Sequence, residues 1–455
     1  MNNMASEPQK RTKFGSKFGV VAAAAGSAVG LGNIWKFPYE AGQNGGAAFL
    51  LVYILCVVLL GIPVMLSEFA IGRRAHANVS GAFRKLTGNN HWIGIGLLGV
   101  LTAFLILSFY FVVAGWSLEY VAQAVSNNFV GKTPADLSVA FTDFTSDTYR
   151  PLFWTAIFVL LTAFVLLAGV EKGIERYSKV LMPFLAVILI LLSIRSVTMP
   201  NGLEGLKFLF KPDFSKITPQ VMLSALGQAF FSLSLGMGCM ITYGSYMRKQ
   251  NNLLQTAIQV TVIDTLVAIL AGVAIFPAVF SLGINPAEGP QLVFVTLPIV
   301  FTHMTGGYIF AILFFLLLAI AAITSTISLQ EVITAYISEE FHLSRKKVVA
   351  ASSLLLMVGA VLASLSLGPY SSLMINGKPL FEVLDFVTSK LFLPFGGLLI
   401  ALFIGWFYKA DDIRDELSNG GKLKSRFFPI YLFLMRYFVP LAILLIFFNE
   451  LGLLR

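Results

Sequence analysis

The chain alternates long apolar runs with short polar connections, and this alternation predicts its architecture. Eleven runs can be separated, each long enough to cross a bilayer at about 20 residues per helical span. They cover residues 14–38, 45–72, 92–126, 151–170, 174–198, 219–247, 252–284, 306–340, 346–368, 379–408 and 426–449. We therefore predict an all-α integral membrane protein with about 11 transmembrane helices, forming a single transmembrane domain over residues 1–455.

Two of the spans contain glycine-rich breaks. Residues 26–33 read GSAVGLGN in the first span, and residues 234–238 read SLGMG in the sixth. Glycine lets a helix unwind, and inside a bilayer unwound backbone persists only where its polar groups find protein, ion or ligand partners. Such breaks at the head of each five-span half predict an inverted five-plus-five repeat with broken helices 1 and 6, and a solute site near the membrane midplane. The predicted halves are 11–198 and 219–408, with 426–449 as an additional helix.

Composition agrees with a membrane protein. Of the 455 residues, 57% are hydrophobic and 12% are charged, and the mean hydropathy is +0.82. The net charge of +9 lies in short loops between spans, so we expect no nucleic-acid partner. The two cysteines, Cys56 and Cys239, lie inside apolar runs and predict neither a disulfide framework nor a cysteine metal site.

Basic residues fall on alternate loops, which predicts the orientation. The clusters lie at residues 11–17, 73–85, 172–179, 248–249, 345–347 and 409–426. The positive-inside rule then places the N-terminus and residues 1–10 in the cytoplasm of a multi-pass cell-membrane protein. The loops at 127–150 and 285–305 would be external, and the second is apolar enough to fold back toward the pathway.

Other classes of membrane protein fit less well. A channel needs a continuous polar pore, whereas this chain has two isolated breaks in apolar helices. An enzyme needs a nucleophile or a metal cluster, yet the four histidines lie mainly at span ends without metal-ligand spacing. We expect no enzymatic activity.

Several segments together carry a family resemblance. These are GSAVGLGNIWKFP at 26–38, NGGAAF at 44–49, GIP at 61–63 with Glu68, GQAFFSLSLG at 227–236, ITYGSY at 241–246, and Thr324-Ser325. The chain resembles the neurotransmitter:sodium symporter family over roughly residues 11–408, and within it the leucine-transporter-like bacterial branch. The resemblance implies sodium-coupled symport of amino acids or related amines by alternating access. A transporter-like sensor that binds an amino acid without transport is the alternative.

The resemblance implies two sodium ions as cofactors, bound by oxygen atoms as hard cations require. The first site matches Ala28, Asn33, Ser232 and Asp264, completed by the substrate carboxylate. The second matches Gly26, Val29, Ala321, Thr324 and Ser325. The hydroxyls of Thr324 and Ser325 have an alternative use, which is hydrogen bonding back to their own helix.

Asp264 departs from the family, whose members commonly carry an amide there. Chloride-dependent relatives fill a nearby anion site with chloride, and chloride-independent bacterial ones supply a carboxylate, often one turn later, where this chain has Ala268. We hypothesise that Asp264 both binds sodium and replaces chloride, with Tyr53, Gln228 and Ser232 as neighbours. A carboxylate within an apolar span is costly and by default functional. The alternative is a protonated structural residue.

The matched substrate site is neutral. The resemblance implies that Gly30 stands where monoamine transporters place an aspartate, so the substrate must bring its own carboxylate. Tyr110 and the amides around Leu31 and Gly32 would bind that carboxylate, near a helix N-terminus. The other matched substrate-binding residues are Ala28, Ile106, Phe231, Ser232, Ser234, Met237, Ser325 and Leu329. None carries a formal charge, which favours neutral, hydrophobic L-amino acids, aliphatic or aromatic. Met237, unbranched and adaptable, favours a broad pocket.

The resemblance also supplies gate residues. Lys36 and Asp385 match the external ion pair, below which Phe231 and Tyr110 form a lid. Lysine replaces the usual arginine and loses bidentate pairing. Arg11 and Glu339 match the internal pair, with Tyr246 nearby. Arg11 has the alternative role of a topology charge. The family uses Glu68 to hold the unwound part of helix six, and Glu331 is open to a structural role.

The fifth span has the spacing of an opening segment. Gly173 and Pro183 would let its cytoplasmic end unwind and open a water path to the second sodium site. A proline near a helix start is also ordinary. The partners predicted are thus a small amino-acid substrate and membrane lipid, and the sequence leaves the oligomeric state open.

Overall fold

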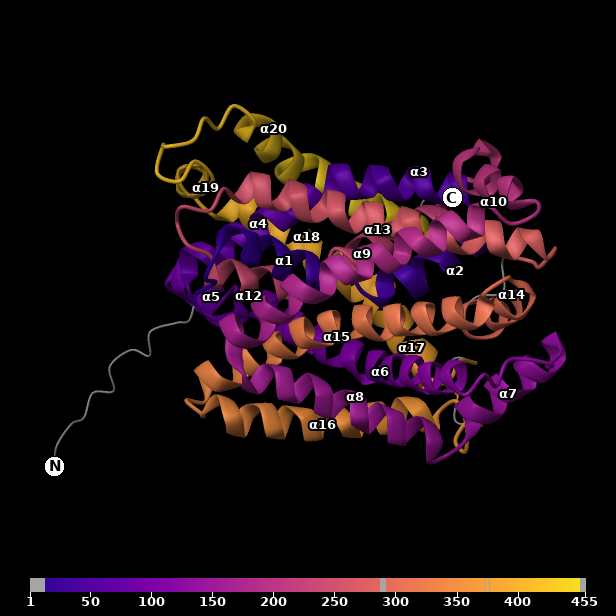
Figure 1. Ribbon diagram of the computed structural model, residues 1–455. Helices are drawn as coiled ribbons and strands as arrows, with labels where there is room; N and C mark the ends of the chain where they lie inside the picture. Colours follow the sequence, from indigo (N-terminus) through magenta and orange to yellow (C-terminus); the bar gives the residue numbers. More distant parts are fainter. Residues whose placement is uncertain (1–12, 287–291, 373, 376, 451–455) are drawn as a thin grey trace.

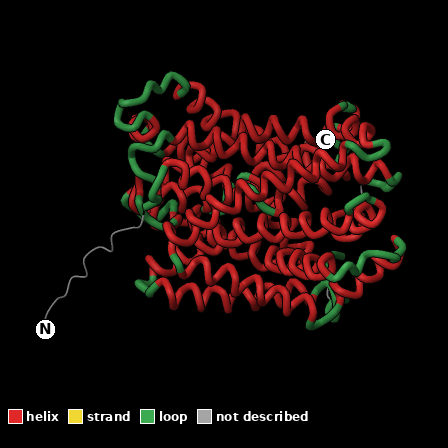
Figure 2. Tube along the Cα trace, in the orientation of Figure 1, coloured by secondary structure: helices red, strands yellow, loops and turns green. Residues whose placement is uncertain are grey.

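The computed structural model describes residues 13–286, 292–372, 374–375 and 377–450. Long helices run side by side through the molecule, and helix is the regular structure of the described part (Figures 1 and 2). Nine helical segments of that part are long and apolar enough to cross a membrane. They are Ala47–Ala75, Ile93–Val125, Arg150–Leu167, Val170–Val197, Leu253–Ser281, Gly307–Glu340, Arg345–Leu365, Leu380–Phe407 and Phe428–Phe448.

The first span is a bent pair of helices. The α1 helix (Lys17–Ala28) is followed after three residues by a second helical segment, Gly32–Gln43, inclined to it by 45°. This second segment consists of η1 (Gly32–Lys36) and α2 (Phe37–Gln43). Alanine and glycine dominate α1, and these small side chains allow it to pack closely among its neighbours in the protein interior. The predicted break at residues 26–33 is therefore present.

The sixth span is also broken. The α11 helix (Pro219–Ser232) ends six residues before α12 (Cys239–Tyr246) begins. The connecting backbone has positive φ at Ser234 (54°), Gly236 (74°) and Gly238 (82°). A Cβ at Gly236 would lie 2.4 Å from the Leu393 carbonyl oxygen, so glycine allows both the turn and the close approach. The described part of the chain therefore has nine apolar spans and a tenth in the bent first pair, and α11 and α12 occupy the region predicted as the sixth span.

The unbroken spans are built from the following elements. They are α3 (Ala47–Cys56), η2 (Val57–Gly61), α4 (Ile62–Ala75), α6 (Ile93–Val125), α8 (Arg150–Leu167), η3 (Val170–Glu175), α9 (Arg176–Val197), α13 (Leu253–Ser281), α15 (Gly307–Glu340), α16 (Arg345–Leu365), α17 (Leu380–Phe386), η6 (Val387–Phe392), α18 (Leu393–Leu402), η7 (Phe403–Phe407), α20 (Phe428–Phe433), η8 (Leu434–Phe438) and α21 (Val439–Glu450). Except for the 3₁₀ turn η4 (Phe214–Lys216), the η segments are π-helical turns, which the apolar pattern does not reveal.

Short helices cap the two ends of the bundle and were not predicted from the sequence. The α7 helix (Pro134–Ser146), α10 (Gly202–Phe210) and α14 (Leu297–His303) gather at one end, on the right in Figure 1. The α5 helix (Val79–Thr87) and α19 (Ala410–Leu417) lie at the opposite end. A capping box starts α7, and the hydroxyl and backbone N–H of Thr133 lower the pKa of the Asp136 carboxyl.

The basic loops share the end that carries α5 and α19. Arg74 pairs with Asp412 at 2.8 Å, joining the end of α4 to α19. Buried Arg73 contacts Glu416 and donates to the Asn251 carbonyl at 2.7 Å, which ties a third loop to the same place. Three of the basic loops that the positive-inside rule assigns to one side of the membrane therefore lie together.

Candidate functional site

The break in the first span faces Asp264 of α13. Asn33 in η1 donates from Nδ2 to Asp264 Oδ1 at 2.8 Å and to the Asp264 carbonyl oxygen at 3.0 Å. Ser232, the last residue of α11, donates from Oγ to the same carboxylate at 2.9 Å. Tyr53 reaches Asp264 Oδ2 at 3.3 Å. Asp264 is fully buried. One residue from each helix break, Asn33 and Ser232, therefore contacts the same buried carboxylate.

The surroundings of Asp264 are rich in neutral oxygen atoms. Within the described residues, no three His, Cys, Asp or Glu side chains form a metal-binding group. A single carboxylate beside hydroxyl and carbonyl oxygens suits a monovalent hard cation. Gln228, which was predicted to adjoin Asp264, donates from Nε2 to the Gly32 carbonyl at 2.7 Å, and its buried Oε1 has no hydrogen-bond partner among the described residues.

A second oxygen cluster joins the first break to α15. Thr324 donates from Oγ1 to the Val29 carbonyl at 3.2 Å and to the Ala321 carbonyl of its own helix at 2.9 Å. Ser325 Oγ lies 3.4 Å from the Ser27 carbonyl oxygen. Both uses considered for these hydroxyls, across to the break and back to their own helix, therefore occur together. Gly26 packs against Ser178 of α9, where a Cβ would lie 3.0 Å from the Ser178 hydroxyl.

A small cavity of about 10 Å³ lies beside the two breaks. Most of the predicted substrate-binding residues line it, and no lining side chain carries a formal charge. The lining comprises Ser27, Ala28, Gly32, Ile106, Tyr110, Phe231, Ser234, Met237, Ser325 and Leu329. Ser27 is the one lining residue that was not predicted from the sequence.

Backbone amides of the first break donate hydrogen bonds to nearby side chains. The Leu31 N–H donates to the Tyr110 hydroxyl at 2.8 Å, and the Gly30 N–H donates to Asn33 Oδ1 at 3.0 Å. The space around Gly30 is tight, because a Cβ there would lie 2.0 Å from Ser325 Oγ and 2.8 Å from the Tyr110 hydroxyl. Ser234 donates to the Ser27 carbonyl at 2.9 Å and thereby links the two breaks directly.

Charged side chains close one side of the cavity. Lys36, 1% exposed, forms an ion pair with Asp385 of α17 and donates to Ser389 Oγ at 2.8 Å. Its ammonium group also lies 4.6 Å from the centroid of the Phe231 ring. The Phe231 ring faces Tyr110 with centroids 6.3 Å apart. The pair predicted as an external gate is thus closed over the cavity.

A second ion pair of opposite polarity lies beside the first. Lys390 Nζ of η6 is 3.1 Å from Glu40 Oε1 of α2 and donates to Ser224 Oγ of α11 at 2.6 Å. The first-span segment thus presents a cation and then an anion, and the tenth-span segment presents an anion and then a cation. This pair was not predicted from the sequence, although Lys36 and Glu40, four residues apart on one helical segment, lie on the same face.

Two further buried acids hold the broken helix six. Glu68 of α4 accepts the Gly236 N–H at 2.7 Å through Oε1. Glu331 of α15, fully buried, accepts two hydrogen bonds from the Arg345 guanidinium at 2.9 and 2.6 Å. Tyr246 of α12 donates to the same Glu331 at 2.7 Å, and the Phe14 ring packs edge-on against Tyr246 at 5.9 Å. Glu331 thus joins α12, α15 and α16, and the missed partner is Arg345.

The predicted internal pair is Arg11 with Glu339. Arg11 lies outside the described residues. Glu339 accepts the backbone N–H of Asn78 at 2.7 Å and its side-chain amide at 3.1 Å.

The fifth span begins with the π-helical turn η3, which contains Gly173. A Cβ at Gly173 would lie 2.3 Å from the Val165 carbonyl oxygen. Glu175 closes this turn and accepts the Gly15 N–H at 2.7 Å, so the start of the first span is attached to the fifth. Pro183 lies inside α9.

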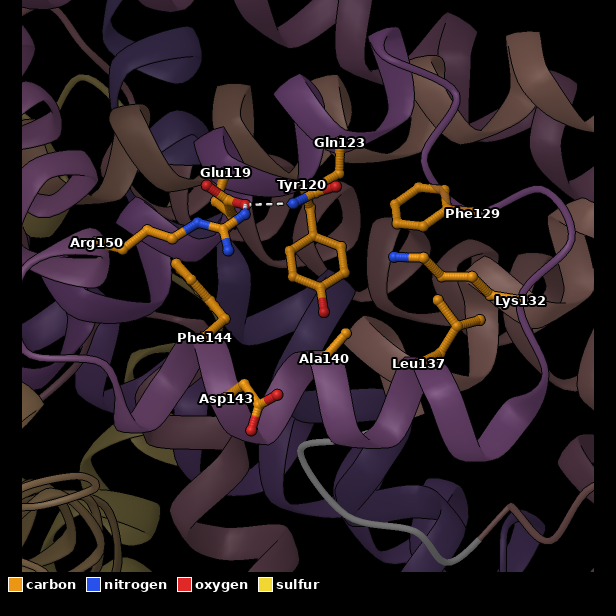
Figure 3. A pocket seen from close by; sticks show the side chains of 10 residues that line it. All are labelled: Glu119, Tyr120, Gln123, Phe129, Lys132, Leu137, Ala140, Asp143, Phe144 and Arg150. Carbon is orange, nitrogen blue, oxygen red and sulfur yellow. Dashed lines mark hydrogen bonds and ion pairs between the residues drawn. The ribbon is translucent and has the colours of Figure 1, made fainter.

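A larger cavity of about 210 Å³ lies elsewhere, where α6, α7 and α8 meet at the end of the bundle (Figure 3). It shares no lining residue with the small cavity. Glu119 accepts from Gln123 at 2.6 Å and contacts Arg150 and Trp154, so its charge is satisfied within the protein. The small cavity is the better candidate site because residues of both helix breaks line it.

Comparisons with known proteins agree with this geometry. The family model described as the sodium:neurotransmitter symporter family matches residues 11–136 and 144–453. An uncharacterized sodium-dependent transporter of Bacillus subtilis is 42% identical over 98% of this chain and 99% of its own length. The sodium- and chloride-dependent GABA transporter 2 of Rattus norvegicus is 25% identical over 95% of this chain and 78% of its own.

A solved structure is similar as well. The crystal structure of MhsT in complex with L-phenylalanine superposes with a TM-score of 0.91 at 45% identity, covering 96% of this chain and 99% of that one. The similarity spans both broken helices and the spans around them. The chain belongs to the sodium:neurotransmitter symporter family.

Proposed function

We propose that this protein carries neutral, hydrophobic L-amino acids into the cell together with sodium, by alternating access and without chloride. The observation that supports this most is the meeting of both helix breaks at buried Asp264, next to an uncharged cavity. A cation bound there would adjoin the carboxylate of a bound amino acid, so each ligand would strengthen the binding of the other.

The proposed sodium sites follow the two oxygen clusters. The first comprises Ala28, Asn33, Ser232 and Asp264, and the second comprises Gly26, Val29, Ala321, Thr324 and Ser325. Hydrogen bonds already join Asn33 and Ser232 to Asp264, and Thr324 to the Val29 carbonyl. The groups proposed to bind each ion therefore already lie next to one another.

Substrate selection rests on charge and space. The Tyr110 hydroxyl and the amides of residues 30–32 would bind the substrate carboxylate, and Ile106, Met237 and Leu329 would contact its side chain. The crystallised relative holds L-phenylalanine, which agrees with an apolar side-chain pocket. Glycine at position 30 has no side chain that could take the place of the substrate carboxylate, so the substrate would need its own.

Alternating access would use the two polar closures. The Lys36–Asp385 and Lys390–Glu40 pairs close one side, and the Glu331–Arg345–Tyr246 network closes the other. The basic loops near α5 and α19 support the placement of that second side, and of the N-terminus, in the cytoplasm.

The deciding test is uptake of labelled phenylalanine, leucine and alanine into proteoliposomes. An inward sodium gradient should drive accumulation, and potassium in its place should not. Replacing chloride by gluconate should leave the rate unchanged. Sodium-independent uptake would contradict the ion sites, and a chloride requirement would contradict the role of Asp264.

A sensor that binds without transport is separated by counterflow. Liposomes loaded with unlabelled substrate should take up labelled substrate by exchange if the protein is a transporter. Sodium-dependent binding without exchange would establish the sensor instead.

Met237 is predicted to set the breadth of the pocket. It is 2% exposed and lines the cavity, so Met237→Phe should exclude large side chains. We expect competition by tryptophan to weaken at least about tenfold, with alanine little affected. Competition assays against labelled substrate measure this. Met222→Phe is the control, because Met222 is 39% exposed on the same span, and unchanged competition in both variants would refute the prediction.

The Glu40–Lys390 pair is predicted to hold the outer gate closed. Glu40→Gln or Lys390→Gln should each speed dissociation of bound substrate about three- to tenfold, because each removes a largely buried ion pair. The double variant should be no worse than either single one, and the exchange Glu40→Lys with Lys390→Glu should recover slow release. Dilution of labelled substrate measures the rate. Glu204→Gln, in the exposed Lys207 pair, is the control, and additive effects would contradict the coupling.

A further inference from the structure

An arginine lies within the last apolar span, and the described protein leaves part of it unpartnered. Arg436 is the third residue of η8 in the segment Phe428–Phe448. Its Nε donates to the Gly405 carbonyl of η7 at 2.5 Å. No hydrogen bond or ion pair to its Nη atoms occurs among the described residues. An ionisable side chain inside a membrane span is costly and usually has a partner.

The guanidinium lies near one end of the neighbouring span. Gly405 precedes the end of that span, Phe407, by two residues. Arginine side chains on a helix point toward its N-terminus, so Arg436 extends from its own position toward the start of the last span at Phe428. Both helices therefore place the guanidinium at the level where phospholipid headgroups begin.

Lipid-facing aromatic rings surround this position. Trp406 is 56% exposed and Tyr437 is 51% exposed, and their rings contact each other edge-on at 5.6 Å. Trp406 also donates from Nε1 to the Arg436 carbonyl at 2.9 Å. Tryptophan and tyrosine prefer the membrane interface. Glycine at 405 permits this packing, since a Cβ there would lie 3.0 Å from Arg436 Cα.

The adjoining loop adds positive charge. Residues 408–427 contain Lys409, Arg414, Lys422, Lys424 and Arg426. Three of the four acids of α19, which are Asp412, Asp415 and Glu416, face Arg73 or Arg74. Because these acids are paired with arginines at the end of α4, the basic side chains of residues 408–427 make the local electrostatic potential positive. Basic pockets between spans on this side of a membrane attract anionic headgroups.

We propose that Arg436, flanked by Trp406 and Tyr437, binds the phosphate of an anionic phospholipid such as phosphatidylglycerol between the tenth and last spans. The Nη atoms supply the two parallel donors that match phosphate oxygens. The rings lie against the glycerol region and the upper acyl chains. The site is distinct from the cavity between the helix breaks and does not depend on the proposed function.

Native mass spectrometry of the full chain tests this site, with phosphatidylglycerol and phosphatidylcholine of matched acyl chains in equal amounts. The wild-type protein should retain one phosphatidylglycerol more than Arg436→Gln. The preference for the anionic lipid should fall about fivefold in that variant. Arg195→Gln, which removes a partly buried arginine from the end of the fifth span, should behave as wild type.

Further variants and ligands make the result decisive. Arg436→Lys keeps the charge but loses the paired donors, and should bind phosphatidylglycerol with intermediate preference. This variant also serves if Arg436→Gln fails to fold. Excess glycerol 3-phosphate should not displace the lipid. Equal retention by wild type and both Arg436 variants would overturn the proposal, as would displacement by glycerol 3-phosphate, which would assign the site to free phosphate.

Discussion

Asp264→Ala is expected to abolish sodium-driven uptake in chloride-free medium, with a loss of at least about 100-fold. The carboxylate is fully buried and accepts from Asn33 and Ser232, so its removal would leave a bound cation without a compensating charge. Leaving a buried charge unpaired costs about 3–5 kcal/mol. Adding chloride should restore part of the uptake, because the anion could occupy the space that the side chain leaves. Uptake into liposomes, in gluconate and then in chloride, measures both effects.

Asp264→Asn separates charge from hydrogen bonding. The amide keeps the size of the side chain and part of its hydrogen bonding, so a protein that needs only structure there would remain active. We expect inactivity in gluconate together with a normal thermal unfolding midpoint in the absence of sodium. The rise in that midpoint on adding sodium should be lost. Normal chloride-free uptake by either variant would assign Asp264 a structural role.

Gly30→Ala is expected to reduce substrate affinity about 10- to 100-fold. The added Cβ would lie 2.0 Å from Ser325 Oγ and 2.8 Å from the Tyr110 hydroxyl, and both groups belong to the proposed ligand sites. Overpacking of this kind costs about 1–3 kcal/mol. Equilibrium binding of labelled substrate at saturating sodium measures the loss.

Gly94→Ala is the matched control for this substitution. Gly94 lies in α6 and has no heavy atom within 4 Å of the Cβ position, so binding should be unchanged. If Gly30→Ala binds substrate with wild-type affinity, the backbone around residue 30 accommodates the added methyl group without loss of binding. The tight space at Gly30 would then have no role in substrate affinity.

The apolar pattern predicted the nine unbroken spans and the bent first span of the described residues, because lipid imposes a length and a composition on each crossing. Glycine clusters located both breaks, since unwound backbone inside a bilayer needs residues that tolerate it. The short helices α5, α7, α10 and α19 were not predicted. Their sequences are mixed in polarity, and packing against the ends of the bundle rather than lipid determines them.

The residues of the candidate site that belong to a sequence motif were predicted. The ion pairs formed by charged residues far apart in the sequence were not. Asn33, Ser232 and Asp264 were expected to meet, and hydrogen bonds join them. Arg345 and Lys390 were overlooked as partners of Glu331 and Glu40, because the fold alone brings each pair together across 14 and 350 residues of chain. Gln228 was predicted beside Asp264, and its hydrogen bond goes to the Gly32 carbonyl, next in the chain to the Asn33 that contacts Asp264.

The π-helical turn η6 sets the register of the outer closure. Asp385 and Lys390 are five residues apart and oppose Lys36 and Glu40, which are four apart. In a regular α-helix, five residues would place the two side chains about 140° apart around the axis. The wider turn brings them to one face. The two ion pairs therefore form in only one register of the two helices, and a shift of one helix by a single residue would break the Lys36–Asp385 and Lys390–Glu40 contacts together.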